Sequence, residues 1–158
     1  MASSSSLPIQ WPEGAPTFNY QGGCHCKKIR FQFEHPEIYS MPALSCNCSM
    51  CASRGYIFVY TPQDKFKLTQ GSEDEISQYT FASHIVQHRF CPTCGTAIGV
   101  LVPSYGYVGI NARTVDGIDL ERLQKNLTKV NGRELTLSTT EDGGELKPSV
   151  SWGNTGRQ

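Results

Sequence analysis

The sequence predicts a mainly β fold with little helix, and two observations support this prediction. Over residues 27–34, the apolar residues Ile29, Phe31 and Phe33 alternate with polar ones, which is the period-two pattern of a half-buried strand. Short segments rich in β-branched and aromatic residues recur along the chain, separated by Gly, Pro, Asp and Ser. Helical periodicity is confined to residues 119–125 and a turn at 49–53.

The predicted strands follow one another closely. In chain order they span residues 17–21, 27–34, 38–46, 56–60, 66–69, 76–81, 86–90, 97–102 and 105–111. The pair Asn131-Gly132 predicts a tight turn between two short strands.

A length of 158 residues predicts one domain, which we place at residues 17–137. Residues 1–16 contain four consecutive serines and several prolines, and they are expected to form a flexible tail. This segment has neither the basic start nor the apolar stretch of a secretory signal, so a cytoplasmic location is expected. Residues 138–158 have little apolar content and are expected to be loosely ordered.

The charge balance excludes some classes of function. Lys plus Arg and Asp plus Glu are 14 each, so the formal net charge is zero, and a nucleic-acid binder with a basic face is not expected. The longest apolar runs are far shorter than the roughly 20 residues that cross a bilayer, so no membrane partner is expected.

Cysteines carry most of the functional information. Their number is seven, and they lie in tight clusters, which favours metal binding over disulfides in a chain without an export signal. Cys24 and Cys26 form one pair, and Cys91 and Cys94 form a second pair in a turn that ends in glycine. Two close pairs of thiolates satisfy a tetrahedral structural zinc; the alternative is four ordinary buried cysteines.

The remaining cluster has three thiolates, Cys46, Cys48 and Cys51, and no eighth cysteine exists to complete it. A catalytic zinc keeps one position open for water or substrate, so three protein ligands indicate such a site. A histidine is the alternative fourth ligand. His25 and His35 are expected at the surface, whereas His84 or His88 would turn the site into a closed Cys3His structural zinc.

Four motifs occur in one order: Gly22-Gly23-Cys24-His25-Cys26, the segment Cys46 to Cys51, Phe90-Cys91-Pro92-Thr93-Cys94-Gly95-Thr96, and the segment Asn111 to Gly117. In this the chain resembles the glutathione-dependent formaldehyde-activating enzyme family, which includes the centromere-protein-V (CENP-V) domain. The resemblance implies a β-tent of stacked antiparallel sheets, a structural zinc on Cys24, Cys26, Cys91 and Cys94, a second zinc on Cys46, Cys48 and Cys51, and carbon–sulfur lyase activity on a glutathione adduct of formaldehyde.

The chain departs from the pattern of that family beside the second site. Asn47 stands where members that resemble the formaldehyde enzyme often carry His, and Ala52 stands where they often carry a basic residue. Arg54, two positions further on, is the candidate to replace the missing charge. These differences leave the substrate less defined than the metal chemistry.

A zinc ion held by three thiolates accepts a soft sulfur ligand readily, which suits the release of a thiolate from carbon. We therefore expect a lyase with two zinc ions, a small thiol adduct as substrate and glutathione as co-substrate. His88 is the candidate for proton transfer, and its alternative is a packed residue. Arg113, together with Asn111, is the candidate anchor for a carboxylate, with a salt bridge to Asp116 as its alternative.

Tyr56 is a candidate pocket residue, although an aromatic residue on a strand usually belongs to the core. Two other functions remain open at this stage. One is the same scaffold acting on a metabolite that does not contain glutathione. The other is a binding module in which both zinc ions are structural, which a closed second site would favour.

Overall fold

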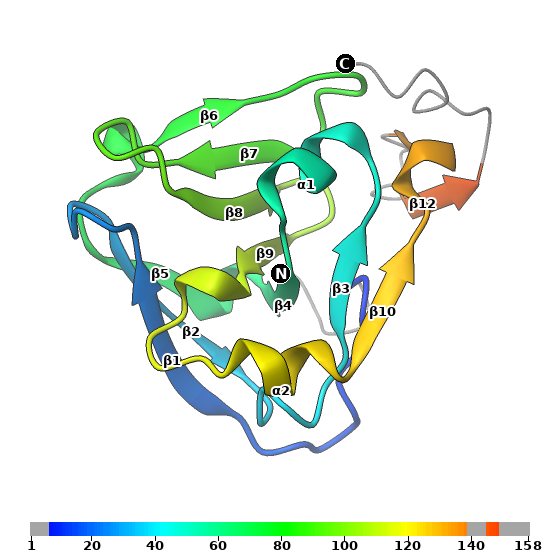
Figure 1. Cartoon of the computed structure of the whole chain (residues 1–158), viewed down its shortest axis with the longest axis horizontal. Helices are drawn as coiled ribbons and strands as arrows, with labels where there is room; N and C mark the ends of the chain where they lie inside the picture. Colours follow the sequence, from blue (N-terminus) through cyan, green and yellow to red (C-terminus); the bar gives the residue numbers. More distant parts are fainter. Residues whose placement is uncertain (1–6, 139–144, 149–158) are drawn as a thin grey trace.

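The computed structural model describes residues 7–138 and 145–148, and two sheets of unequal size dominate it (Figure 1). The smaller sheet has the order β1-β2-β5 and is antiparallel throughout. Its strands are β1 (Phe18–Gly23), β2 (Arg30–His35) and β5 (Phe66–Gln70). The prediction of a mainly β fold with little helix is confirmed.

The larger sheet has seven strands in the order β10-β3-β4-β9-β8-β7-β6. Its neighbours are antiparallel except for β10 and β3, which are parallel. The strands are β3 (Ala43–Cys46), β4 (Phe58–Pro62), β6 (Ser77–Tyr79), β7 (Gln87–Phe90), β8 (Ala97–Val102), β9 (Tyr107–Asn111) and β10 (Leu127–Val130).

The remaining elements are short. A hairpin of β11 (Leu135–Ser138) and β12 (Glu145–Pro148) forms a third sheet. The two α-helices are α1 (Ser49–Arg54) and α2 (Leu120–Gln124), and single 3-10 turns occur at Gln63–Lys65, Glu73–Glu75, Ala112–Thr114 and Gly132–Glu134. None of the helices in the described residues is long and apolar enough to cross a membrane.

Side-chain alternation gives the larger sheet two apolar faces. On β4, Val59 packs into a core shared with Phe31 and Phe33 of the smaller sheet, whereas Phe58 and Tyr60 belong to a second cluster. Because successive side chains of a strand point to opposite faces, the sheet separates the two clusters. The first cluster is the core between the sheets, and the second surrounds the three-cysteine segment.

The predicted strand over residues 38–46 is too long. Residues 37–40 form a turn in which the Ser40 amide donates to the Glu37 carbonyl, and β3 begins only after Pro42. Proline has no amide hydrogen for a ladder bond, so the apolar residues Ile38 and Met41 are buried without being part of a strand.

The segment before β1 packs against the second cluster. Leu7 is buried, and the Trp11 indole Nε1 donates to the Tyr60 carbonyl oxygen at 3.2 Å. Residues 1–6 of the predicted flexible tail lie outside the described residues, as do 139–144 and 149–158 of the predicted C-terminal tail. The strand β12 falls within that second tail and pairs with β11.

Candidate metal centres and pocket

Four cysteines meet where two turns from different sheets come together. Cys24 and Cys26 lie in the turn between β1 and β2, and Cys91 and Cys94 lie in the turn between β7 and β8. Their four sulfur atoms all lie within 4.8 Å of one another. The Sγ atoms of Cys24 and Cys26 are 3.6 Å apart, and those of Cys26 and Cys91 are 3.7 Å apart.

The surroundings of this cluster suit thiolates. The Ile29 amide donates to Cys24 Sγ at 3.3 Å, and the Thr93 amide donates to Cys91 Sγ at 3.4 Å. A hydrogen bond from the Thr96 hydroxyl, 3.1 Å from the sulfur, lowers the pKa of Cys94 to about 5. Since zinc binds the deprotonated thiol, the four donors fit a closed tetrahedral zinc site.

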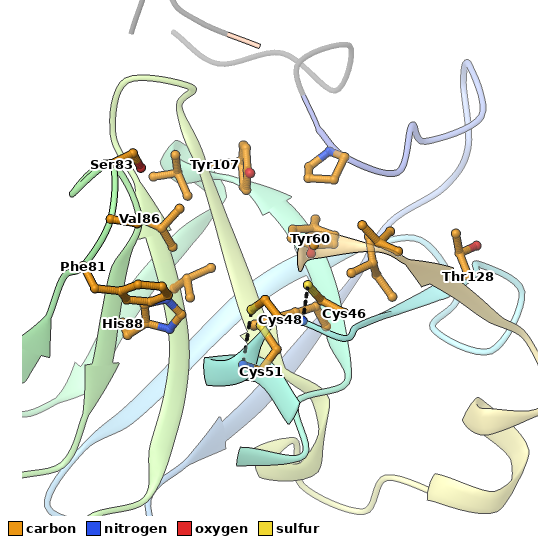
Figure 2. Close-up of a pocket in the computed structure, with 18 residues that line it drawn as sticks. Cys46, Cys48, Cys51, Tyr60, Phe81, Ser83, Val86, His88, Tyr107 and Thr128 are labelled. Atoms are coloured by element: carbon orange, nitrogen blue, oxygen red, sulfur yellow. Dashed lines mark hydrogen bonds between the residues drawn. The ribbon is translucent and has the colours of Figure 1, made fainter. Parts of the chain in front are cut away.

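The second cluster lies where β3 passes into α1. Cys46 is the last residue of β3, Cys48 is the N-cap of α1, and Cys51 lies within the helix. Their sulfur atoms are also within 4.8 Å of one another. Backbone amides point at the sulfurs, because Cys48 N donates to Cys46 Sγ and Cys51 N donates to Cys48 Sγ, each at 3.4 Å (Figure 2).

The local sequence explains this geometry. A thiol at the N-cap replaces the usual Ser or Asp and accepts the hydrogen bond of a free helical amide. The helix ends at Gly55, whose φ of 64° is left-handed, so the chain turns back toward β4 after little more than one turn. Hydrogen bonds among the three sulfurs lower the pKa of Cys48 and raise those of Cys46 and Cys51, so Cys48 is the first of the three to become a thiolate.

No fourth side-chain ligand joins the second cluster among residues 7–134, which include all four histidines. His84 lies in an exposed turn with a φ of 58°, and its Nδ1 is 2.8 Å from the Thr80 hydroxyl. His25 is exposed as predicted. His35, predicted at the surface, is instead buried against Trp11, Tyr20 and Phe33, because its ring completes an aromatic cluster. Three thiolates with an open side fit a zinc ion that keeps a position for an exogenous ligand.

A pocket of about 560 Å³ adjoins these three cysteines (Figure 2). Its other walls come from β4, β7, β8, β9 and β10, from the loop before β7 and from Pro8. Aliphatic and aromatic side chains dominate them: Leu44, Phe58, Tyr60, Phe81, Val86, Val100, Val102, Tyr107 and Val130. None of the described lining residues is Asp, Glu, Lys or Arg.

His88 is the lining residue with the clearest chemical capacity. It is 4% exposed, and its Nδ1 has no hydrogen-bond partner among the described residues. Phe81 packs against the imidazole with the ring centroids 5.4 Å apart, and both residues flank the side of the pocket opposite Thr128 in Figure 2. Burial, helped by the charge of Arg54, lowers the pKa of His88 to about 4, so the ring is neutral at pH 7.

Arg54 and Tyr56 lie behind this wall rather than on it. Arg54 Nη1 donates to the Tyr56 hydroxyl at 3.3 Å, and its guanidinium lies 5.3 Å from the centre of the Phe90 ring. Tyr56 is buried and stacks on Phe58 at 4.5 Å, with its centroid 6.1 Å from that of His88. Tyr56 therefore packs against the pocket wall, Arg54 lies one residue further back, and neither is a lining residue.

Asn111 and Arg113 are not pocket-lining residues either. The Asn111 side chain donates to the Ala97 carbonyl at 2.9 Å and accepts from the Arg113 amide at 3.3 Å. Arg113 Nε donates to the Gly55 carbonyl at 2.9 Å, so the guanidinium binds the C-terminal end of α1. Asp116, the partner of Arg113 in the alternative of a salt bridge, pairs with Arg30 instead.

Gly132 lies against the three-cysteine cluster, whereas the sequence predicted only a tight turn at this position. A Cβ at this position would lie 2.2 Å from Cys46 Sγ and 3.2 Å from the Cys48 Cβ. Only glycine leaves room for the sulfur, and the parallel pairing of Val130 with Cys46 brings residue 132 there. In the sequence this glycine follows the short segment 127–130, but nothing there indicates that the segment pairs with residues 43–46.

Comparison with known proteins gives two findings. A family model described as "Glutathione-dependent formaldehyde-activating enzyme" matches residues 19–131, a span that contains both cysteine clusters. The crystal structure of a Rhodobacter sphaeroides protein, a structural-genomics target, is similar with a TM-score of 0.62 and 24% sequence identity. That match covers 70% of this chain and 99% of the other, and it shows a shared fold.

Proposed function

Because the chain belongs to the glutathione-dependent formaldehyde-activating enzyme family, we propose that it is a zinc-dependent carbon–sulfur lyase. Its substrate is the thiol adduct of an aldehyde, with glutathione as the thiol. The observation that carries this proposal is the three-cysteine cluster, whose open side adjoins the apolar pocket. A closed Cys3His site would have favoured a binding module, and no histidine atom of the described residues joins the cluster.

The two cysteine clusters have different roles in this proposal. Cys24, Cys26, Cys91 and Cys94 hold a structural zinc between the sheets, and Cys46, Cys48 and Cys51 hold the second ion. When bound, that second zinc supplies an open coordination position at which a thiolate is stabilised at neutral pH. The amide hydrogen bonds to Cys46 and Cys48 fix the sulfur positions before any ligand arrives.

The reaction is a simple elimination. The carbon–sulfur bond of a thiohemiacetal breaks and sulfur keeps the electron pair, while the hydroxyl loses its proton as the aldehyde forms. His88, the histidine that lines the pocket, accepts this proton on its imidazole ring. Burial keeps this imidazole neutral at pH 7, and the nearby negative charge of Cys48 favours its protonated form. The reverse reaction returns the proton to the oxygen.

Metal content and turnover of the glutathione–formaldehyde adduct, measured on the same samples, test this proposal. Cys48→Ala is expected to lose one of two zinc ions and all measurable turnover, whereas His88→Gln is expected to keep both ions and lower kcat by roughly 100-fold. Ser53→Ala, on the exposed side of α1, is the control and is expected to match the unaltered protein. Full turnover by Cys48→Ala would reject the proposal.

A further inference from the structure

The composition of the pocket wall carries an inference about the substrate that goes beyond the reaction class. One wall comes from β8, where Val100 and Val102 point into the cavity, and another comes from the loop before β7, with Phe81 and Val86. In Figure 2, Phe81 and Val86 lie on the opposite side of the cavity from Cys46, Cys48 and Cys51. The thiolates are therefore at one side of a chamber that is otherwise apolar.

Away from the three cysteines, the polar groups of the chamber carry no fixed charge. Burial raises the pKa of Tyr60 and of Tyr107, so both hydroxyls are protonated at neutral pH. Ser83 and Thr128 add neutral hydroxyls, and His88 is a neutral imidazole. A charged substrate group would lose its hydration here without gaining an ionic partner from the described lining residues, which is strongly unfavourable.

Glutathione carries two carboxylates and one ammonium group at neutral pH. By the argument above, these groups do not enter the chamber, and only the sulfur end reaches the thiolates. The apolar volume is then left for the electrophile. At about 560 Å³ the chamber has the size of sites that hold drug-sized ligands, whereas formaldehyde has two non-hydrogen atoms.

We propose that the electrophile is an uncharged aldehyde with an aromatic body, bound between Phe81, Val86 and Val100 with its carbonyl carbon toward His88 and the three cysteines. This inference rests on the lyase function proposed above and specifies its substrate class. Phe81 and Tyr107 offer ring faces or edges to such a body, and the valines fill the space between them. Formaldehyde is too small to contact this wall, and it is therefore a poor substrate.

Turnover is compared for three glutathione adducts: those of formaldehyde, 2-naphthaldehyde and 6-carboxy-2-naphthaldehyde. Zinc-loaded protein is used, and exchange NMR follows interconversion of adduct and free aldehyde. We expect kcat/KM for 2-naphthaldehyde to exceed both others by roughly tenfold or more, because its apolar body is buried and uncharged. An equal or higher value for formaldehyde or for the carboxylate overturns the inference.

Two variants locate the aldehyde. Val86→Trp fills the chamber and is expected to lower kcat/KM for 2-naphthaldehyde by roughly tenfold or more. Ile85→Trp, at the neighbouring half-buried position that does not line the pocket, is the matched control and is expected to change it less than about twofold. Equal losses in both variants would place the aldehyde elsewhere.

Direct binding separates failure of this inference from failure of the lyase function. The neutral probe 2-naphthalenemethanol and the anionic probe 2-naphthalenesulfonate, whose sulfonate is a weak ligand for zinc, are titrated by calorimetry. If only the neutral probe binds, and Val86→Trp weakens this binding, the inference about an uncharged aromatic ligand is supported. If no adduct is turned over in addition, the lyase function is rejected. Turnover of the formaldehyde adduct without binding of the neutral probe overturns the inference and leaves the lyase function standing.

Discussion

His35 shows how a single side chain on a strand can set the response of the protein to acid. Its ring lies among Trp11, Tyr20 and Phe33, with Nδ1 2.8 Å from the Pro36 carbonyl oxygen. Burial lowers the pKa of His35 to about 4, so the folded protein keeps the ring neutral well below the usual value of 6.5. The Pro36 carbonyl pairs with Nδ1 of the neutral ring, and burial disfavours the charged form.

The sign of the pH effect follows from this depressed pKa. As the pH falls below about 6.5, His35 takes up a proton in the unfolded chain but not in the folded one, so stability is lost progressively down to about pH 4. The slope contributed by His35 is at most about 1.4 kcal/mol per pH unit. His35→Phe is expected to remove this part of the slope in urea unfolding between pH 6.5 and 5.

The control for this measurement is His84→Phe, since His84 lies in an exposed turn. It is expected to keep the slope of the unaltered protein. An unchanged slope in His35→Phe would show that His35 is not the group responsible.

At the residue scale, the sequence predicted the two cysteine clusters better than the residues around them. Each cysteine pair or triplet is local in the chain, so spacing alone indicated the two clusters that the structure brings together. The partners of Asp116 and Arg113 depend on which strands pair: Asp116 pairs with Arg30, and Arg113 donates to the Gly55 carbonyl, so the alternative of a salt bridge between Arg113 and Asp116 is not what the structure shows. The surroundings of His35 depend on contacts between strands and on the segment before β1.

At the scale of elements, the contact between β10 and the β3–α1 segment also depends on which strands pair. Parallel pairing of β10 with β3 carries the chain past Cys46, and the next turn begins with Gly132 against that sulfur. Sequence patterns predicted strands at the places of β1 to β9, but neither β10 nor its pairing with β3, because residues 127–130 are a short segment that lies far from its partner. The three cysteines are local in the chain, but the glycine packed against Cys46 comes from a distant part of the sequence.

Gly132→Ala tests that contact. The added Cβ would meet Cys46 Sγ, so the three-cysteine site is expected to lose its zinc and the four-cysteine site to keep its own. Elemental analysis should find one zinc per chain instead of two. Gly14→Ala is the control, since a Cβ there meets nothing within 4 Å. Two zinc ions in Gly132→Ala would mean that β10 gives way and that the glycine is not required.

For the molecule as a whole, the four-cysteine cluster joins two sheets that also meet through side-chain packing and through the hydrogen bond from the Thr61 hydroxyl to the Glu34 carbonyl. Cys24 and Cys26 belong to the smaller sheet's first turn, and Cys91 and Cys94 to a turn of the larger sheet. An ion bound there links two parts of the chain far apart in sequence. It is expected to stabilise the folded state, because the unfolded chain does not hold the four donors together.

Cys91→Ser should therefore destabilise the protein far more than Cys51→Ser. We expect the melting temperature to fall by about 10 °C or more in Cys91→Ser, and by less than half of that in Cys51→Ser, by calorimetry on zinc-loaded samples. Both cysteines are buried, so the loss of a packed sulfur is similar in the two variants. Equal decreases would contradict a stabilising role specific to the four-cysteine site.

The sequence predicted the fold class and the family resemblance, whereas the pocket could not be predicted from it. The pocket needs side chains from most strands of the larger sheet, from the loop before β7 and from the segment before β1. Which side of a strand faces that space depends on register, and a shift of one residue would exchange the two faces. Phe81, Val86 and Val100 therefore look like ordinary core residues in the sequence.

The three-cysteine ligands and most of the pocket wall belong to different stretches of the chain. Cys46, Cys48 and Cys51 lie within one short segment, and the apolar wall is distributed over strands and loops that do not bind the metal. Substitutions in the wall can change which electrophile is accepted while the metal-binding segment keeps its sequence. The scaffold therefore lends itself to divergence, in evolution or by directed mutagenesis, toward new substrates with one unchanged bond-breaking step.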